Sequence, residues 1–264
     1  MLHTFVVGLG RSGEGLHLPS LATARAQDPA LFAPGPVVGF DPFRDPVEGV
    51  LTVDSPEEAV RHAPPASTVV HLCTPPRLRS GPLERLARPG YRRFIVEKPL
   101  APDLVGLAAV ARLRRRWGPD ITVTTQWLDS ALTRRLRAAR RGRIFGELRS
   151  VTVLKHKPRF TRTERVPGRP TAFDVELPHA LAVVVSLAGG ADIASAALED
   201  TVTDRIRLPR MGRARLDSAH HCGVRSRIDS DLPRPYASAA SRWSSTASWS
   251  PATTRAAGPT TPPS

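Results

Sequence analysis

The sequence has 264 residues, of which 41% are hydrophobic and 23% are charged, and it carries a formal net charge of +14. This length is sufficient for about two domains with buried cores. No apolar stretch approaches the roughly 20 residues of a membrane-spanning helix. Cys73 and Cys222 are the only cysteines, which excludes a disulfide framework. We therefore expect a cytoplasmic protein with no membrane partner.

The positive charge comes almost entirely from arginine, because Lys98, Lys155 and Lys157 are the only lysines. Two arginine-rich segments, 112–116 and 134–141, fall on predicted helices with apolar residues between the arginines. Solvated helix faces explain this pattern, and no nucleic-acid-binding motif accompanies it. We therefore expect no nucleic-acid partner.

In chain order, the first elements are a strand, a glycine-rich turn, a helix and a second strand. The apolar run 4–7 leads directly into a loop with the sequence Gly8-Leu9-Gly10-Arg11-Ser12-Gly13. The pattern of a strand, G-x-G-x-x-G and a helix is typical of dinucleotide-binding units. Gly8 permits the tight turn, Gly10 lets a pyrophosphate approach the backbone, and Gly13 lets the helix pack closely on the strand. Arg11 and Ser12 complete the loop at the helix N-terminus, which favours negative charge.

The second strand, over 37–40, ends on Asp41. An acid at this place accepts a hydrogen bond from the 2′-hydroxyl of the adenosine ribose and favours NAD. Arg44, three residues later, provides an alternative, because it could contact the 2′-phosphate of NADP. The predicted cofactor is therefore NAD or NADP, with NAD preferred.

Strands and helices continue to alternate as far as residue 125. The predicted strands cover 50–53, 68–73, 94–96 and 121–125, and the predicted helices cover 57–60, 83–86 and 107–113. This alternation predicts an α/β fold with a doubly wound parallel sheet, a Rossmann domain over 1–125.

Two further loops follow strands of this sheet, Thr74-Pro75-Pro76 and Glu97-Lys98-Pro99. Ligands bind at the carboxyl ends of such strands, so Thr74, Pro75, Glu97 and Lys98 join the glycine loop as candidate cofactor-binding residues. Lys98 is well placed to exchange a proton with a substrate hydroxyl or carbonyl. A surface lysine in a proline turn is the alternative explanation.

The pattern changes after residue 125. Helices are predicted over 130–141 and 173–187 and strands over 148–155 and 194–198, which indicates a partial α+β domain over 126–200. From 201 to 264 the periodicity fades, and Ser, Arg, Pro, Thr and Ala dominate. We expect this last segment to be of low complexity and poorly ordered. A shifted reading frame near residue 200 is one hypothesis for the change.

The glycine loop, residues 69–76 and the segment Val96-Glu97-Lys98-Pro99-Leu100-Ala101 together resemble the glucose–fructose oxidoreductase / inositol dehydrogenase / MocA-like (Gfo/Idh/MocA) family. Glu147, in Gly146-Glu147-Leu148, resembles the family's entry into its second domain. The resemblance covers residues 3–200. It implies a Rossmann domain and a truncated α+β domain that provides substrate and dimer contacts, and therefore a homo-oligomer if that domain's sheet is complete. It also implies hydride transfer between nicotinamide and a sugar, polyol or related CH-OH/C=O substrate, and a Lys98–Pro99 bond that can be cis.

The family's second catalytic element is a helix with an Asp followed four residues later by a His. Here His179 matches the histidine, but Val175 occupies the position of the acid. Glu176, three residues before His179, shares its helix face, whereas Asp174, five residues before, does not. Lys98, His179 and Glu176 are therefore the candidate catalytic residues. A packing role for His179 is the alternative.

Three positions depart from the family pattern and leave the substrate open. Arg79 replaces a frequent histidine, and Gln126 and Trp127 stand where relatives have other substrate-facing residues. Gln126 and Trp127 are the candidate substrate-binding residues. No metal site is expected, because His220, His221 and Cys222 are adjacent and not spaced for ligation. The predicted function is an NAD(P)-dependent oxidoreductase, and the alternative is a catalytically impaired NAD(P)-binding protein with an incomplete substrate domain.

Overall fold

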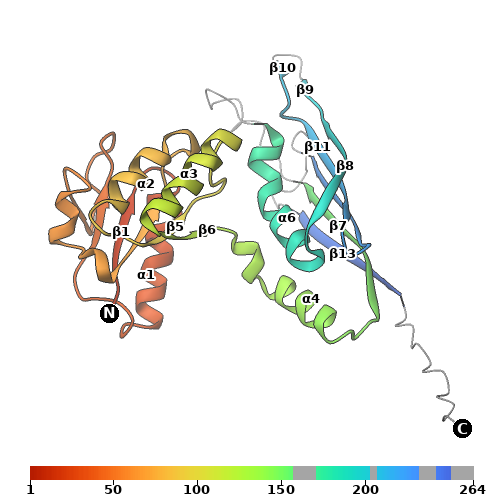
Figure 1. Ribbon diagram of the computed structural model, residues 1–264, viewed down its shortest axis with the longest axis horizontal. Helices are drawn as coiled ribbons and strands as arrows, with labels where there is room; N and C mark the ends of the chain where they lie inside the picture. The colour runs from red at the N-terminus through yellow and green to blue at the C-terminus, as the bar shows by residue number, and fades with distance from the viewer. Residues whose placement is uncertain (157–170, 203–206, 232–241, 251–264) are drawn as a thin grey trace, which may run out of the picture. The chain divides into compact units, whose positions relative to one another are not determined.

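The computed structural model describes residues 1–156, 171–202, 207–231 and 242–250. The chain divides into two compact units, Met1–Thr124 and Thr125–Ser264. Each unit has its own sheet (Figure 1). Each also has its own hydrophobic core. No helix among the described residues is long and apolar enough to cross a membrane.

The first unit is built on a six-stranded sheet in which every neighbouring pair is parallel. The strand order is β3-β2-β1-β4-β5-β6. From β1 the chain first adds strands toward one edge of the sheet, through β2 to β3, and then adds β4 to β6 toward the other edge, so the order reverses between β1 and β4. This is the Rossmann order, and the predicted fold class is confirmed. The strands are β1 (His3–Val7), β2 (Val37–Phe40), β3 (Val50–Thr52), β4 (Thr68–Leu72), β5 (Arg93–Val96) and β6 (Asp120–Val123).

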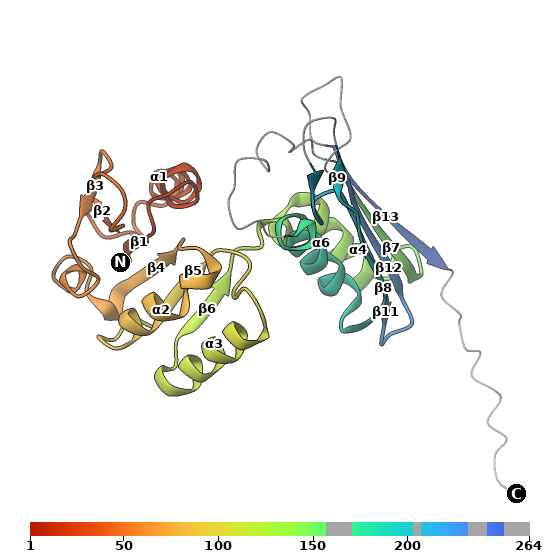
Figure 2. The same cartoon turned by 90° about the horizontal axis from the view of Figure 1, so that it is seen from above.

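Helices cover both faces of this sheet. Figure 2 shows α1 (Leu18–Gln27) on one face and α2 (Ser80–Ala87) and α3 (Leu104–Trp117) on the other. Because a parallel sheet is buried on both sides, its central strands are continuous apolar runs. Short helical turns complete the unit: η1 (Gly13–His17), η2 (Glu58–Arg61), η3 (Pro65–Ser67) and η4 (Pro76–Leu78).

Two side chains cap helical segments in the first unit. Asp103 accepts a hydrogen bond from the Gly106 amide at 2.8 Å and caps α3. Ser55 accepts one from the Glu58 amide at 3.1 Å at the start of η2. Each bond satisfies an amide that has no partner within its helix.

The second unit contains a five-stranded mixed sheet in the order β13-β7-β12-β11-β8. Helix α6 (Ala172–Ala188) packs on this sheet through Val183, Val184 and Leu187. Figure 2 shows α6 and α4 (Ala131–Arg141) on the same side of the sheet. The strands are β7 (Glu147–His156), β8 (Ala191–Leu198), β11 (Arg213–His220), β12 (Arg225–Asp231) and β13 (Arg242–Ser250). A separate hairpin pairs β9 (Thr201–Val202) with β10 (Arg207–Leu208), and η5 (Gln126–Asp129) precedes α4.

The expectation of a poorly ordered segment over 201–264 is wrong for its described residues. Strands β11 and β12 pair with each other, and β12 and β13 flank β7 in the sheet. Burial alternates along β11, with Ala214, Leu216, Ser218 and His220 facing inward. These inward positions are mostly small or polar, which hides the alternation from a hydrophobicity pattern. Residues 232–241 and 251–264 lie outside the described residues.

Some of the chain's arginines form ion pairs on the outward face of β11 and β12. Arg213 and Arg215 on β11 both bond the Asp229 carboxylate on β12, at 2.6 and 3.0 Å. Arg227 pairs with Asp217 at 2.6 Å in the same ladder. Such cross-strand pairs of opposite charge stabilise the register of the two strands.

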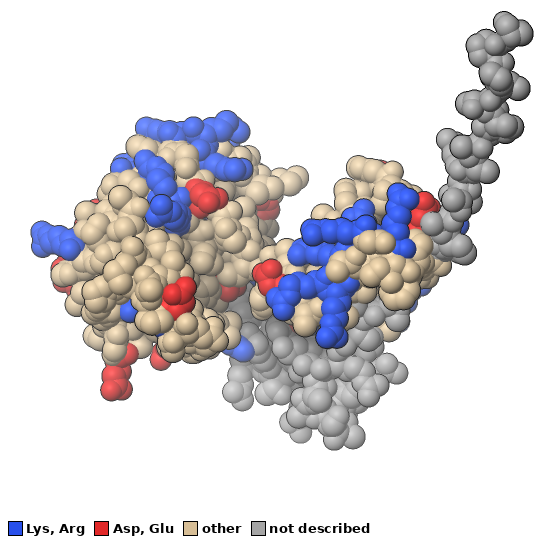
Figure 3. Space-filling view, turned by 90° about the horizontal axis from the view of Figure 1, so that it is seen from below, with Lys and Arg blue, Asp and Glu red and all other residues tan. Residues whose placement is uncertain are grey.

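The arginine-rich segments of the two predicted helices lie on solvated surface. Arg112 and Arg114–Arg116 of α3 are exposed, as are Arg134, Arg135, Arg140 and Arg141 of α4. Figure 3 shows Lys and Arg side chains gathered in several patches on the viewed face. This distribution fits the arginine faces expected for helices that bury their apolar side.

Candidate functional site

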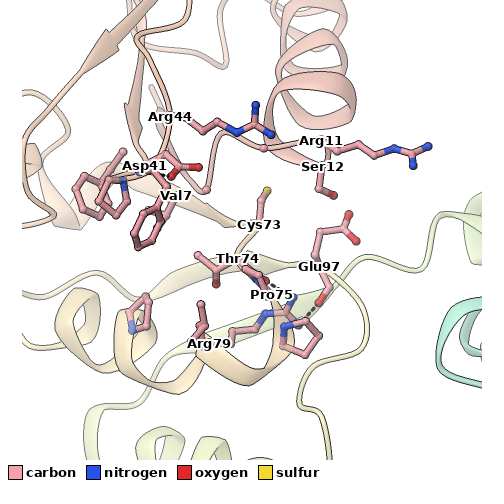
Figure 4. Close-up of a pocket in the computed structure, with 18 of the residues that line it drawn as sticks. Val7, Arg11, Ser12, Asp41, Arg44, Cys73, Thr74, Pro75, Arg79 and Glu97 are labelled. Carbon is pink, nitrogen blue, oxygen red and sulfur yellow. Dashed lines mark hydrogen bonds between the residues drawn. The ribbon is translucent and has the colours of Figure 1, made fainter. Parts of the chain in front are cut away.

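A cavity of about 660 Å³ lies in the first unit where strands β1, β2, β4 and β5 end (Figure 4). It occupies the point at which the strand order reverses, where open α/β sheets bind their ligands. Ten of the eleven predicted cofactor-binding residues line it, and Gly13 is the exception. The ten are Gly8, Gly10, Arg11, Ser12, Asp41, Arg44, Thr74, Pro75, Glu97 and Lys98.

The glycines of the first loop differ in what surrounds them. Gly8 has a positive φ of 91°, and a Cβ there would lie 3.1 Å from the Cys73 carbonyl carbon. A Cβ on Gly13 would lie 2.0 Å from the Gly8 carbonyl oxygen. Gly10 is open, because only Arg44 Nη2, at 3.9 Å, is within 4 Å of a Cβ built there. The loop therefore needs glycine at Gly8 and Gly13 for its own geometry and leaves space at Gly10.

The helical segment after the loop begins directly at the cavity. The Glu14 amide donates to the Gly10 carbonyl at 2.9 Å, so the amides of Arg11, Ser12 and Gly13 are the first donors of this segment. The first amides of a helix have no intrahelical acceptor and carry partial positive charge. This edge of the cavity suits an anionic group such as a pyrophosphate.

Asp41 and Arg44 follow strand β2 and line the same cavity as the glycine loop. One Asp41 carboxylate oxygen accepts from the Leu9 amide at 2.8 Å, and the other accepts from the Phe43 amide at 3.0 Å. These bonds tie the acid at the end of β2 to the turn after β1. The side chain that would select between cofactors is therefore fixed by the same loop that would hold their pyrophosphate.

A chain of hydrogen bonds joins two buried histidines to Glu97. His17 Nε2 lies 3.1 Å from Glu97 Oε1, and His17 Nδ1 lies 2.9 Å from His71 Nδ1. A carboxylate only accepts, so His17 donates to Glu97 through Nε2, and one proton lies between His17 Nδ1 and His71 Nδ1. The carboxylate thereby fixes the orientation of the His17 ring. These two histidines were not among the predicted site residues.

The protonation of this chain follows from burial and its own hydrogen bonds. Burial, aided by the neighbouring His17, lowers the pKa of His71 to about 4, so His71 is neutral at pH 7. Burial raises the pKa of Glu97, but bonds from His17, Thr124 and Ser12 and the charge of His17 outweigh it and lower the value overall. Glu97 is therefore a carboxylate at the cavity wall.

The buried His71 predicts a stability that falls in mild acid. Its folded pKa of about 4 lies below the ordinary value of 6.5, so the unfolded chain takes up a proton first as the pH falls. Stability from this group is complete above pH 6.5 and is lost as the pH falls toward 4, by roughly 3 kcal/mol in total. Thermal unfolding followed between pH 7 and pH 4.5 measures this loss. His71→Gln should flatten the curve in that window, and an equally steep curve for the variant would contradict the assignment.

Arg79 proves to be a buried residue that bonds backbone, whereas the sequence placed it where relatives have a histidine near the substrate. Its side chain is only 2% exposed. Its guanidinium donates to the carbonyl oxygens of Glu97, Pro99 and Thr74. Burial lowers its pKa to about 10, so it stays charged at pH 7. The Lys98–Pro99 bond between two of these acceptors is cis.

Lys98 lies at the cavity wall between Glu97 and Pro99. The nearby thiol of Cys73 is not a candidate nucleophile or proton-exchanging group. Burial, together with the charge of Glu97, raises the pKa of Cys73 to about 12. The thiol therefore stays protonated and unreactive at pH 7.

The other predicted functional residues belong to the second unit, where three of them gather. The Trp127 ring stacks on the His179 ring with centroids 5.5 Å apart and an interplanar angle of 27°. Lys155 Nζ lies 5.1 Å from the centre of the Trp127 ring, within cation–π range. Lys155 also forms an ion pair with the buried Glu176 carboxylate. Gln126 is exposed in the same turn as Trp127.

Two features of helix α6 concern the acids near His179. Asp174 is the helix's capping acid, because its carboxylate accepts from the Thr171 amide at 2.8 Å. Helix α6 continues through Pro178, so that Glu176 and His179, three residues apart, share one helical segment. Asp174 is therefore engaged in capping the N-terminus of the helix.

Lys155 is a member of this cluster that the sequence reasoning missed. The signal was present in the predicted strand over 148–155, because Lys155 is in phase with the inward-facing Val151 and Val153. A period of two along a strand places all three side chains on one face. A lysine on the inward face of a strand is buried, and a buried ammonium group requires an acid as its partner.

No protein-family model matches the sequence, and no curated protein matches it. Several solved structures, however, match the fold of this chain. One is a putative NADPH-dependent oxidoreductase from Desulfitobacterium hafniense, with a TM-score of 0.75 and 14% identity, matched over 94% of this chain and 70% of that one. Another is a D-galactose-1-dehydrogenase from Rhizobium etli, with a TM-score of 0.65 and 22% identity, matched over 88% and 71%.

A third solved structure holds ligands. It is the WlbA dehydrogenase from Chromobacterium violaceum in complex with NADH and UDP-GlcNAcA, with a TM-score of 0.72, 16% identity, and coverage of 89% of this chain and 68% of that one. At these identities the likeness establishes the fold, which agrees with the strand order and the position of the cavity. The chain has the fold of the NAD(P)-binding oxidoreductases of the Gfo/Idh/MocA type.

Proposed function

We propose that this protein is an NAD(P)-dependent oxidoreductase that transfers a hydride between nicotinamide and a sugar, polyol or related CH-OH/C=O substrate. The observation that carries the proposal is the cavity at the strand-order reversal. There the glycine loop, Asp41 and the Glu97-Lys98-Pro99 loop meet. A pyrophosphate site, a ribose-binding acid and a proton-exchanging lysine are the groups that such a reaction requires.

The residues that line the cavity support a nicotinamide dinucleotide as its ligand. Gly10 leaves open space beside the first helical amides, and Asp41 offers a fixed carboxylate. When bound, the cofactor supplies hydride transfer at its nicotinamide ring. The protein's own contribution is to hold the phosphates at the amides of Arg11–Gly13 and to direct the ribose with Asp41.

We assign the proton of the reaction to Lys98, whose ammonium exchanges it with the substrate hydroxyl or carbonyl oxygen. His179 is the proposed acid/base or orienting group of the second unit. Glu176, three residues earlier on helix α6, is its proposed partner and forms an ion pair with Lys155. Trp127 offers an aromatic face, with Gln126 next to it for hydrogen bonds. The D-galactose dehydrogenase and the NADH–UDP-sugar complex among the structures of this fold support a sugar-like substrate.

NAD is the proposed preference, because the Asp41 carboxylate would repel a 2′-phosphate. Asp41→Asn removes this charge while Arg44 remains, and we expect the ratio of NADPH to NADH affinity to rise by roughly tenfold. Fluorescence titration with both reduced cofactors measures the ratio. Asp45→Asn, an exposed acid outside the cavity, is the matched control. An unchanged ratio in the Asp41 variant would remove Asp41 as the selecting residue.

The function itself is tested by two measurements on the full chain. NADH and NADPH titrations detect binding, and a panel of sugars and polyols then detects turnover through the absorbance of the reduced nicotinamide. Binding with turnover on at least one substrate supports the proposal. Binding without turnover favours the alternative, a nucleotide-binding protein with an impaired substrate domain, and absence of binding refutes both.

A further inference from the structure

We propose that Arg79 is a positioning residue that fixes the geometry of Lys98, and this inference rests on the proposed function for its catalytic consequence. The side chain is almost completely buried, at 2% exposure. A buried guanidinium pays a large desolvation cost unless its donors are used. Here the donors are directed at the backbone of the loop that carries the proposed proton-exchanging residue.

The bonds of Arg79 surround Lys98 on both sides. Nη1 donates to the carbonyl oxygens of Glu97 and Pro99, the residues directly before and after Lys98. Nη2 donates to the Thr74 carbonyl oxygen at 2.7 Å, in the loop that follows β4. One planar guanidinium therefore ties the two loops together at the cavity wall, as Figure 4 shows for Arg79 and Glu97.

The chemistry of arginine suits this task. Its fork presents several donors in a fixed plane, so a single side chain can hold three carbonyl groups at once. Arg79 lies between the helical turn η4 and helix α2 as the N-cap residue of α2, which gives the fork a rigid base. A second tie reaches the same loop through the Glu97 carboxylate, which accepts from His17. Arg79 therefore holds the backbone of Glu97 and His17 holds its side chain. Because Lys98 is the next residue, its backbone position is restrained as well.

Misplacing a reacting group by about 1 Å costs roughly 10²-fold in rate. We therefore expect Arg79→Met, which keeps the aliphatic stem and removes the fork, to lower kcat about 10²-fold. The KM for the cofactor should change by less than about threefold, because the phosphate-binding loop is not held by Arg79. A residue that contributes only stability would leave kcat of the folded protein unchanged.

The direct test reads the reactivity of Lys98 and does not need turnover. The chain has only three lysines, so peptide mass spectrometry resolves acetylation of Lys98 by acetic anhydride, with the α-amino group of Met1 as internal reference. Release of the loop should raise the labelling rate of Lys98 at least about fivefold in Arg79→Met. Arg88→Met is the matched control, because Arg88 follows helix α2, does not line the cavity, and pairs through its guanidinium with the Glu84 carboxylate at 3.1 Å.

The second variant, Arg79→Gln, retains one short donor and serves where Arg79→Met does not fold. A raised Lys98 labelling rate in a folded Arg79 variant, with an unchanged rate in Arg88→Met, supports the proposal. A rate within about twofold of the unchanged protein in a folded Arg79 variant overturns it. Failure of both Arg79 variants to fold also overturns it, because Arg79 would then be needed for folding itself. If no substrate is ever turned over, the labelling result still stands, so the two proposals fail separately.

Discussion

The protein with Lys98→Met is expected to bind NADH within about twofold of the unchanged protein and to lose about 10³-fold in turnover. Methionine retains the length of the side chain at the cavity wall but has no proton to exchange. General acid–base groups contribute about 10² to 10⁴-fold, and Lys98 is the proposed group of this kind in the first unit. The loss should therefore appear in kcat and not in the affinity for the cofactor.

The measurement combines NADH fluorescence titration with steady-state turnover on the best substrate of the sugar and polyol panel. Arg88→Met again provides the control for the loss of one cation from the first unit, since Arg88 is exposed, lies outside the cavity and is paired with Glu84. Full turnover by Lys98→Met would show that Lys98 is a surface lysine in a proline turn, the alternative that the sequence left open.

Gly13→Ala is expected to prevent folding of the first unit. The added Cβ would lie 2.0 Å from the Gly8 carbonyl oxygen and 3.3 Å from Val6 Cγ1, so backbone or core must move. Clashes with rigid backbone produce losses above about 4 kcal/mol, a large part of the 5–15 kcal/mol that stabilises a typical domain. Soluble yield and thermal unfolding measure this effect.

Two neighbouring glycines make the comparison sharp. No atom lies within 4 Å of a Cβ on Gly15, so Gly15→Ala should fold normally. Gly10→Ala should fold too, because only the flexible tip of Arg44 is near, but its methyl group would occupy the space proposed for the pyrophosphate. NADH affinity at least about tenfold weaker in folded Gly10→Ala would agree with this. A fully stable Gly13→Ala protein would contradict the packing argument.

Local patterns were sufficient to predict the first unit. Continuous apolar runs that end in glycine or proline loops define parallel strands, and the spacing of Gly8, Gly10 and Gly13 depends only on short-range geometry. The cavity then follows from topology, because the carboxyl ends of parallel strands meet at one edge. Ten of the predicted residues line it for this reason.

The second unit was harder to predict, because its strands carry little hydrophobic signal. Strand β11 alternates Arg213, Arg215 and Asp217 with inward-facing Ala214, Leu216 and Ser218, a pattern that resembles polar coil when read by composition. Its stability comes from pairing with β12 and with the earlier strand β8, and from packing against helix α6. A local window around β11 contains neither β8 nor α6.

The sequence by itself determined the Rossmann topology, the glycine loop and the lysine loop, because each depends on the order and spacing of neighbouring residues. Only the tertiary structure decided which polar side chains are bonded to one another. His17 reaches His71 and Glu97 across 54 and 80 residues, and Arg79 reaches Pro99 across 20. A buried donor takes whichever acceptor the fold brings within about 3 Å. That proximity is a property of the packed chain and leaves no mark on local sequence.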